Sequence, residues 1–520
     1  MNVGEIARGL PIAAIVPDLL ERETDSKANL VIEAPPGAGK TTVVPIALLQ
    51  AMGDAPGTII VVQPRRLAAR LSALRVASLL GESIGERVGY SVRFDRVVSA
   101  RTRILFVTEG VLLRQLRGAE GEPSAVATVI LDEFHERSLD GDLLLALLRR
   151  AQRRGSGPRL VVMSATLDGE PVANYLGARR LRSEGRSFPV EVEYPKPSRS
   201  RGDEPPLDRK VAAAVHELVE RGLIGRASPG GHALVFLPGS REIRACAERC
   251  AGIAERAGLA VHVLHGSLAK ELQDRAVTGP GDKLILATNV AETSITIDGV
   301  VAVIDSGLAR VAGVDPGTGM PRLELAPISR ASAAQRAGRA GRTRPGVCLR
   351  LYGKHDHDHR PAFDMAEIRR LDLTGAVLEL AAAGIHVDHA DDFAWFEEPP
   401  EAALASATRL LRQLEAIDDQ GALTEVGREM LRYPLHPRLA RLLHAAVGLG
   451  VGESAATIAA LLAAAWFVER VSDVANPFAG PLTWLEAHPL LLLGSLALGA
   501  LAARFAHASR SEQLVAEPSA

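Results

Sequence analysis

The chain has 520 residues, and its 60 Lys and Arg against 62 Asp and Glu give a net charge of −2. The length allows about three to four domains, and the near-neutral charge gives no global signature of a nucleic-acid-binding protein. Three cysteines are too few for a disulfide framework, so we expect a reducing compartment, the cytoplasm.

The chain carries no obvious membrane or export segment. The first ten residues include Glu5 and Arg8 and lack a long apolar core, so we expect no secretory signal. The longest uncharged apolar run, residues 489–503, is shorter than the roughly 18–20 residues of a membrane span. A buried helix is expected there, and no membrane partner.

The first predicted elements form a phosphate-binding unit. Residues 29–33 are typical of a buried strand, residues 34–41 read Ala-Pro-Pro-Gly-Ala-Gly-Lys-Thr, and residues 42–49 favour a helix. Such a turn points free N–H groups and the helix dipole at one place, which suits phosphate. We expect Lys40 to reach the β- and γ-phosphates and Thr41 to hold Mg²⁺. The residues expected to contact the nucleotide here are Gly37, Ala38, Gly39, Lys40, Thr41 and Thr42.

About ninety residues later, a second apolar strand ends in two carboxylates. Residues 127–131 are apolar, and residues 132–135 read Asp-Glu-Phe-His. Ligands of parallel sheets bind at the carboxyl ends of strands. Asp132 and Glu133 are expected at the metal together with Thr41, and Glu133 also suits a base that orients water. The two strings together predict a site that binds and hydrolyses a nucleoside triphosphate, with ATP and Mg²⁺ as cofactors.

Alternating strands and helices extend over most of the chain. Buried strands are predicted at residues 58–62, 103–107, 127–131 and 160–163, and again at 233–237, 260–264, 283–287 and 300–304. From about residue 361 the strand pattern gives way to helical spacing, at residues 368–383, 401–417 and 439–446. The predicted fold class is therefore α/β, with two tandem parallel-sheet domains followed by an all-helical C-terminal region.

A series of motifs in the expected order makes the chain resemble the DEAH-box branch of superfamily 2 helicases, most closely the bacterial HrpB type. The resemblance covers about residues 10–450, and Phe134, where many relatives have Ala, points to this subgroup. It implies a RecA-like helicase ATP-binding domain (1–185), a RecA-like helicase C-terminal domain (186–355), a winged-helix-like domain (356–432) and a partial ratchet-like region (433–520). It also implies a monomeric, ATP-dependent helicase or translocase whose partner is single-stranded RNA, or DNA.

The resemblance also assigns roles to single residues. Residues 63–66, Gln-Pro-Arg-Arg, are similar to a motif that meets the nucleic-acid backbone. The implied nucleic-acid contacts are Arg65, Arg66, Thr108, Arg241, Gly266, Thr288, Asn289 and Thr293. Ser164 and Thr166 would couple the hydrolysis site to the strand groove, and Asp298 would lie near the nucleotide. Arg75 would stack on the base or simply lie on a helix surface, and Arg65 and Arg66 could be solvated surface charge.

Residues 335–342, Gln-Arg-Ala-Gly-Arg-Ala-Gly-Arg, resemble a further motif of this family. A helical turn between Arg339 and Arg342 would place both guanidiniums on one face. Arginine is permanently charged and matches phosphate oxygens bidentately. Across a domain cleft the pair would act as arginine fingers, worth on the order of 10³–10⁵ in rate, and Gln335 would help position the attacking water. His135 would couple the two domains, or only pack near the metal.

Several segments allow a less specific interpretation. Residues 310–325 predict a β-hairpin around Asp-Pro-Gly-Thr-Gly, and residues 195–206 a polar, Pro-rich loop. The His355-to-His359 run has metal-ligand residue types but no matching distant cluster, so a polar interdomain loop is favoured. Plain packing is favoured over metal binding for Cys246 and Cys250, and over base stacking for Trp466.

Two alternative functions stay open. Proteins of this type continue well beyond the ratchet domain, whereas this chain stops at Ala520, so we expect no complete oligonucleotide-binding domain. An ATP-switched nucleic-acid-binding or assembly module without unwinding activity is one alternative. A DNA-directed translocase is the other, because motifs that contact the backbone carry no base information.

Overall fold

The computed structural model describes residues 2–21, 28–117, 126–165, 169–185, 188–195, 205–266, 268–292, 297–314, 321–342, 344–386 and 393–459. The chain divides into two compact units, residues 1–311 with 325–367 and residues 312–324 with 368–520. Some predictions fall outside the described residues: those for Thr166, Thr293, Trp466, the hairpin tip 315–319, the apolar run 489–503 and most of the loop 195–206.

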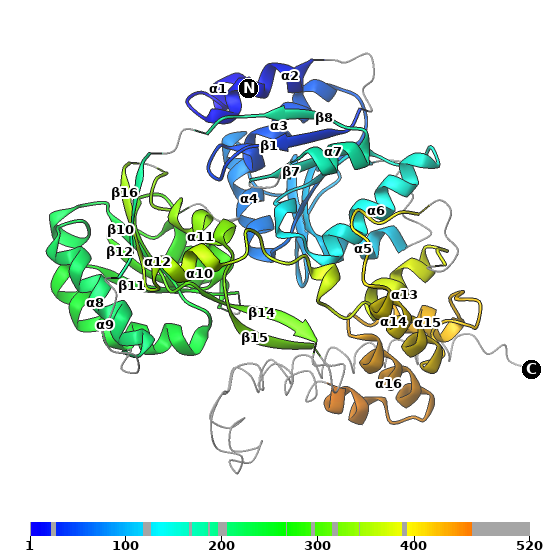
Figure 1. The fold of residues 1–520 in the computed structure, drawn as a ribbon. Coiled ribbons are helices and arrows are strands. Elements are labelled where there is room, and N and C mark those ends of the chain that lie inside the picture. Colours follow the sequence, from blue (N-terminus) through cyan, green and yellow to red (C-terminus); the bar gives the residue numbers. More distant parts are fainter. Residues whose placement is uncertain are drawn as a thin grey trace, which may run out of the picture. The chain divides into compact units, whose positions relative to one another are not determined.

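The first unit begins with an eight-stranded sheet in the order β4-β3-β5-β2-β6-β7-β1-β8 (Figure 1). The predicted strands are present and pair in parallel as β1 (Leu30–Glu33), β2 (Thr58–Gln63), β5 (Ile104–Thr108), β6 (Val126–Leu131) and β7 (Arg159–Ser164). The unpredicted strands are β3 (Val88–Val92), β4 (Asp95–Val97) and β8 (Arg179–Arg182). The connecting helices are α3 (Lys40–Met52), α4 (Arg66–Leu79), α5 (Glu109–Arg117), α6 (Leu139–Arg153) and α7 (Glu170–Leu176).

An N-terminal segment completes the core of this sheet. It forms α1 (Val3–Ile6), η1 (Pro11–Ile15) and α2 (Val16–Leu20). Val3 and Ile12 are fully buried in one cluster with residues of β1, β2, α3 and α4. The backbone N–H of Ile12 also donates to Ala38 O at 3.1 Å. The segment therefore supports the loop that precedes α3.

The second sheet of this unit has six strands in the order β11-β12-β10-β13-β16-β9. They are β9 (Val190–Glu193), β10 (His232–Phe236), β11 (Ala260–Leu264), β12 (Lys283–Ala287), β13 (Val300–Asp305) and β16 (Gly346–Arg350), all paired in parallel. The helices are α8 (Leu207–Glu220), α9 (Ser240–Ala257), α10 (Lys270–Thr278), α11 (Arg330–Ala337) and α12 (Lys354–His359).

Both faces of the second sheet are buried. Along β10, Ala233 and Val235 pack against α8 and α9, which lie side by side (Figure 1), whereas Leu234 and Phe236 pack on the other face with residues of α10 and α11. Such burial on both faces explains why these strands read as continuous apolar runs. Leu67 of α4 joins the second of these clusters, so the two sheet domains share apolar contact.

The second unit contains the end of one strand, the start of the next and a set of helices. β14 (Leu308–Val314) and β15 (Pro321–Pro327) form a two-stranded sheet, as the hairpin prediction requires. The helices are α13 (Thr374–Ala382), α14 (Glu401–Gln413), α15 (Glu425–Met430) and α16 (Pro437–Gly448). Thr424 caps α15 by accepting from Gly427 N at 3.0 Å. A Cβ on Gly427 would lie 2.1 Å from Ala416 O, so only glycine fits there.

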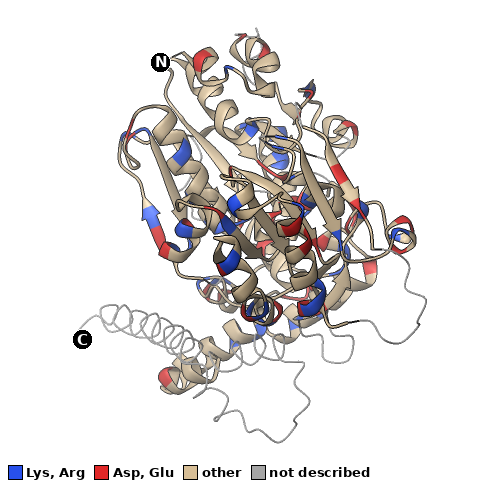
Figure 2. Ribbon diagram, turned by 90° about the vertical axis from the view of Figure 1, so that its left-hand side faces the viewer, with Lys and Arg blue, Asp and Glu red and all other residues tan. Residues whose placement is uncertain are grey.

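The predicted fold class is confirmed: two parallel-sheet α/β domains precede a helical C-terminal region. One local prediction was wrong, because residues 354–359 form the helix α12 instead of a loop. Two ion pairs at helical spacing explain the difference: Lys354 with Asp358 at 2.8 Å and Asp356 with Arg360 at 2.7 Å. No described helix is long and apolar enough to cross a membrane. Figure 2 shows Lys and Arg interspersed with Asp and Glu over the described elements.

Candidate active site

The phosphate loop connects β1 to α3. Gly37 and Gly39 have φ values of 82° and 94°, a region that residues with a Cβ rarely adopt. At Gly39 a Cβ would also lie 2.9 Å from Leu10 Cδ1 of the N-terminal segment. Thr42 Oγ1 donates to Gly39 O at 3.1 Å and fixes the first turn of α3. The helix N-terminus therefore faces the loop, as an anion site requires.

A hydroxyl and a carboxylate meet beside this loop. Thr41 Oγ1 donates to Asp132 Oδ2 at 2.6 Å, and Gln63 Nε2 donates to the same oxygen at 2.7 Å. Burial and the neighbouring Glu133 together raise the pKa of Asp132 to about 6, although Lys40 and the hydrogen bonds from Thr41 and Gln63 oppose the rise. Hydroxyl and carboxylate oxygens are the hard ligands that Mg²⁺ takes beside phosphate oxygens, so these residues fit the expected metal.

Glu133 and Lys40 form a buried pair. Lys40 Nζ lies 3.7 Å from Glu133 Oε1, and the two side chains are only 4% and 7% exposed. Burial alone would raise the pKa of Glu133, but Lys40, His135, Arg339 and Arg342 outweigh it and hold this pKa below its usual value. Glu133 is therefore an ionised carboxylate close to Lys40, Arg339 and Arg342. Its φ of 54° is left-handed, which costs on the order of 1–3 kcal/mol.

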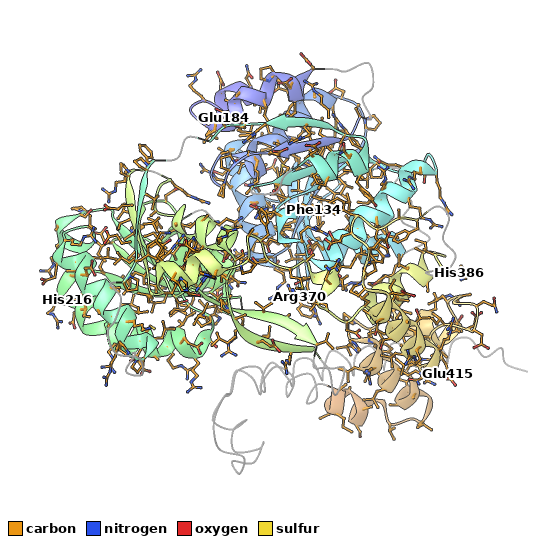
Figure 3. All side chains as sticks on the ribbon, in the orientation of Figure 1. Phe134, Glu184, His216, Arg370, His386 and Glu415 are labelled. Atoms are coloured by element: carbon orange, nitrogen blue, oxygen red, sulfur yellow. The ribbon has the colours of Figure 1, made fainter. Side chains whose placement is uncertain are left out.

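His135 connects the carboxylate to the next strand end. Its Nδ1 lies 3.5 Å from Glu133 Oε2 and accepts from Ala165 N at 3.4 Å. Burial lowers the pKa of His135, so the ring is neutral near pH 7. Ala165 stands between Ser164, which ends β7, and Thr166. Phe134, buried beside His135, lies within the first domain in Figure 3.

The two arginines of residues 335–342 lie in a turn, not on a helix as predicted. α11 ends at Ala337, and the backbone continues in tight turns with Arg339 N donating to Arg336 O at 3.1 Å. Gly338 is the C-cap residue, with a right-handed φ of −60°, and beyond it the hydrogen bonds span three residues instead of four. Burial first, and then repulsion from Arg342, lower the pKa of Arg339. Burial lowers that of Arg342 to about 10, although Glu133 and Asp298 oppose this.

Both arginines nonetheless act on residues of the first sheet domain. A Cβ on Gly37 would lie 3.6 Å from Arg342 Nε, so the guanidinium lies over the loop. Arg339 donates to the backbone O of Glu292 and acts electrostatically on Glu133. Gln335 is buried on α11. Cations from the second sheet therefore meet Lys40 and Glu133 of the first.

Arg336, to which sequence reasoning gave no role, anchors this turn. It is fully buried, and it donates to Glu292 Oε2 and to Asp305 Oδ1 at 2.9 Å each. Its guanidinium lies 4.9 Å from the centre of the Phe236 ring. The sequence of the motif does not distinguish this arginine from Arg339 and Arg342, because the three differ only in the residues that they contact in the folded chain.

A basic cavity of about 460 Å³ opens between the two sheet domains. Its lining includes five residues predicted to bind nucleic acid: Arg65, Arg66, Gly266, Thr288 and Asn289. The lining residues that were missed include Arg70, Arg93, Phe94 and Lys270. Arg70 follows Arg66 by one helical turn on α4, a spacing that could have revealed it. Thr108, at the end of β5, and Arg241, exposed at the start of α9, do not line this cavity.

Contacts between the two sheet domains surround the cavity. Arg65 donates to Asn289 O and pairs with Glu136 at 3.0 Å, and Arg70 forms a bidentate pair with Asp274 of α10. Phe94, in the turn between β3 and β4, has a φ of 70° and is 69% exposed.

Two predicted nucleotide contacts lie outside the centre of the site. Arg75 is exposed on α4, and both of its interpretations stay predictions. Asp298 is exposed as well and acts electrostatically on Arg342.

The chain matches three models of known protein families. They are the DEAD/DEAH box helicase at residues 13–175, the helicase conserved C-terminal domain at 210–344, and the winged-helix helicase associated domain (HA2) at 407–435. The chain is 41% identical to the ATP-dependent RNA helicase HrpB of Escherichia coli (strain K12), over 87% of this chain and 54% of that protein.

Two solved structures are similar along most of the chain. The crystal structure of the Escherichia coli DEAH/RHA helicase HrpB has a TM-score of 0.77 and 39% identity, over 94% of this chain and 60% of that one. A crystal structure of the E. coli DExH-box NTPase HrpB has a TM-score of 0.71 and 39% identity, over 94% and 58%. The chain thus spans little more than half the length of these relatives.

Proposed function

Because this chain belongs to the DEAH-box helicases of the HrpB type, we propose that it hydrolyses ATP and uses the cycle to move on single-stranded RNA. The observation that carries the proposal is the meeting of Lys40 and Glu133 of the first sheet domain with Arg339 and Arg342 of the second. This arrangement lets hydrolysis respond to the approach of two domains. We also propose a monomer in the cytoplasm, where its three buried, unpaired cysteines would stay reduced.

The residues suggest a division of labour during hydrolysis. When ATP binds, Lys40 leaves its ion pair with Glu133 and contacts the terminal phosphates instead. The Glu133 carboxylate is then free to orient the attacking water. Thr41 and Asp132 would hold Mg²⁺, whose charge offsets that of the phosphates. Arg339 and Arg342 stabilise the charge that develops on the γ-phosphate, with Gln335 beside the water. His135 and Ser164 carry the change toward the strand site.

The basic cavity is the proposed strand site. Arg65 and Arg66 approach it from α4 and Gly266, Thr288 and Asn289 from the second sheet, so each domain contributes to it. Arginines that bind phosphate oxygens do so independently of sequence. RNA is favoured as substrate because the relative of 41% identity is an RNA helicase, and DNA stays the alternative.

Substitution of Lys40 tests the site. Lys40→Ala should abolish ATP turnover while the circular dichroism spectrum stays unchanged, and Lys354→Ala, which removes an exposed ion pair on α12, should keep turnover. Unchanged turnover in Lys40→Ala would end the assignment.

Stimulation by nucleic acid tests the substrate. Single-stranded RNA should raise the ATPase rate more than DNA of equal length, and a strand-displacement assay should show duplex opening. A flat ATPase response at low salt contradicts the strand site. Turnover without displacement would instead indicate a binding module that ATP switches.

A further inference from the structure

Gln63 stands between the metal site and the basic cavity. It is the last residue of β2 and is only 1% exposed. Two residues later Arg65 begins the series of arginines that line the cavity, with Pro64 as the short connection. The end of β2 is therefore joined to the arginines of the cavity by a single residue.

The side chain of Gln63 points toward the carboxylate of Asp132. Its Nε2 donates to Asp132 Oδ2 at 2.7 Å. An ionised carboxylate only accepts hydrogen bonds, so the NH₂ group must face it and Oε1 must face elsewhere. This Oε1 is buried and has no hydrogen-bond partner among the described residues. It would be left to accept a further hydrogen bond, which a water molecule could donate.

Gln63 Nε2 and the backbone N–H of Glu133 are the donors on Asp132 that would remain if Thr41 held a metal. Oδ2 is shared by Gln63 and by Thr41 Oγ1, which lies at 2.6 Å. Thr41 would turn its hydroxyl to the metal, and this hydrogen bond would then be lost. Oδ1 keeps its contact from the backbone N–H of Glu133 at 2.8 Å. The orientation of the Asp132 carboxylate would then depend on Gln63 at Oδ2 and on the Glu133 N–H at Oδ1.

The backbone couples the same two strands. Asp132 N donates to Val62 O at 3.0 Å, directly before Gln63. Asp132 is thus fastened to the end of β2 by its backbone and by its side chain. A shift at this end changes the position and the orientation of the carboxylate together.

We propose that Gln63 is a positioning residue that fixes Asp132 for Mg²⁺ and thereby couples occupancy of the nucleotide site to strand binding in the cavity. This inference rests on the proposed function for the identities of the two ligands. Gln63 would thus connect the two sites without contacting the ligand of either.

The test uses Gln63→Met, which keeps the length of the side chain and removes both polar atoms. Binding of a fluorescent, non-hydrolysable ATP analogue is measured at increasing Mg²⁺ concentrations. We expect the variant to need at least about tenfold more Mg²⁺ than the wild type for half-maximal binding. The dissociation constant of a labelled oligouridine strand is then measured with and without Mg²⁺ and the analogue. The ratio of these constants, on the order of 5–150 for coupled sites, should fall toward 1.

Gln152→Met is the matched control. This substitution in the same domain also removes hydrogen bonds, to Asn29 and to Pro158 O, but Gln152 is distant in sequence from Gln63 and Asp132. It should keep the wild-type values. Gln63→Asn, whose amide is one methylene too short, makes the same measurement if Gln63→Met does not fold. A wild-type Mg²⁺ requirement and a wild-type ratio in both Gln63 variants would overturn the inference. If the wild-type chain itself binds no strand, the proposed function fails, and the Mg²⁺ titration alone still decides the positioning role.

Discussion

Replacing Arg336 by Met should strongly destabilise the fold, although Arg336 belongs to the same short motif as the two proposed arginine fingers. Its guanidinium bonds two carboxylates, Glu292 and Asp305, inside the second sheet domain. Burial would lower the pKa of Arg336, but these two anions outweigh it and raise it. The charge is therefore fully compensated in the folded chain.

The structure sets the size of this effect. Arg336 and Asp305 are 1% and 0% exposed, so the Met variant leaves buried carboxylates without their cation. Removing one partner of a buried pair costs about 3–5 kcal/mol. Tyr352 Oη still donates to Asp305 Oδ2 at 2.9 Å, and Ser332 Oγ still donates to Glu292. These bonds place the expected loss near the lower end, about 3 kcal/mol.

Urea-induced unfolding followed by circular dichroism measures this loss. Arg330→Met on the same helix is the matched control, because Arg330 is exposed and surface changes stay within about 0.5 kcal/mol. A loss below about 1 kcal/mol in Arg336→Met, or an equal loss in the two variants, would refute the reasoning that Arg336 anchors the turn.

Two further predictions concern pH and salt. Burial raises the pKa of Glu109 from 4.5 to about 8, so the folded chain keeps a proton that the unfolded chain has released, and stability is lost as the pH rises from about 5 to 8. Glu109→Gln should flatten this dependence in urea unfolding at both pH values, and an equally steep loss in the variant would contradict it. Arg65→Ala should weaken RNA binding and reduce the slope of log affinity against log salt concentration by about 0.7, as titrations between low and moderate salt would measure. An unchanged slope would remove Arg65 from the strand site.

The sheet architecture could be predicted because its strands are buried on both faces. Runs such as residues 58–62 and 300–304 are continuously apolar, and they appear as β2 and β13. β8, in contrast, is Arg179–Arg182 with one buried residue, so no hydrophobic pattern marks it. The N-terminal helices were missed because all three are short, and η1 and α2 contain Pro11 and Pro17. The domain boundaries stay predictions.

The residues of the site could be predicted only where a short sequence motif determines the local backbone geometry. Gly37, Lys40 and Thr41 follow from the loop, and Asp132 follows from the end of a strand. The partners of Gln63 and Arg336 could not, because both depend on strand order and on contacts distant in sequence. The turn at Arg339 and Arg342 was predicted as helical because their spacing fits a helix, whereas Gly338 ends α11 before them.

The central claim is that one domain holds the triphosphate while arginines of the other neutralise its terminal group. Single-turnover hydrolysis and nucleotide binding of Arg342→Ala test it most directly, with Arg344→Ala, which removes a contact to Ser228, as the control. The account predicts that the hydrolysis rate of Arg342→Ala falls on the order of 10³ or more, while the nucleotide dissociation constant changes far less. Equal losses in rate and in binding, or a wild-type rate, would contradict it.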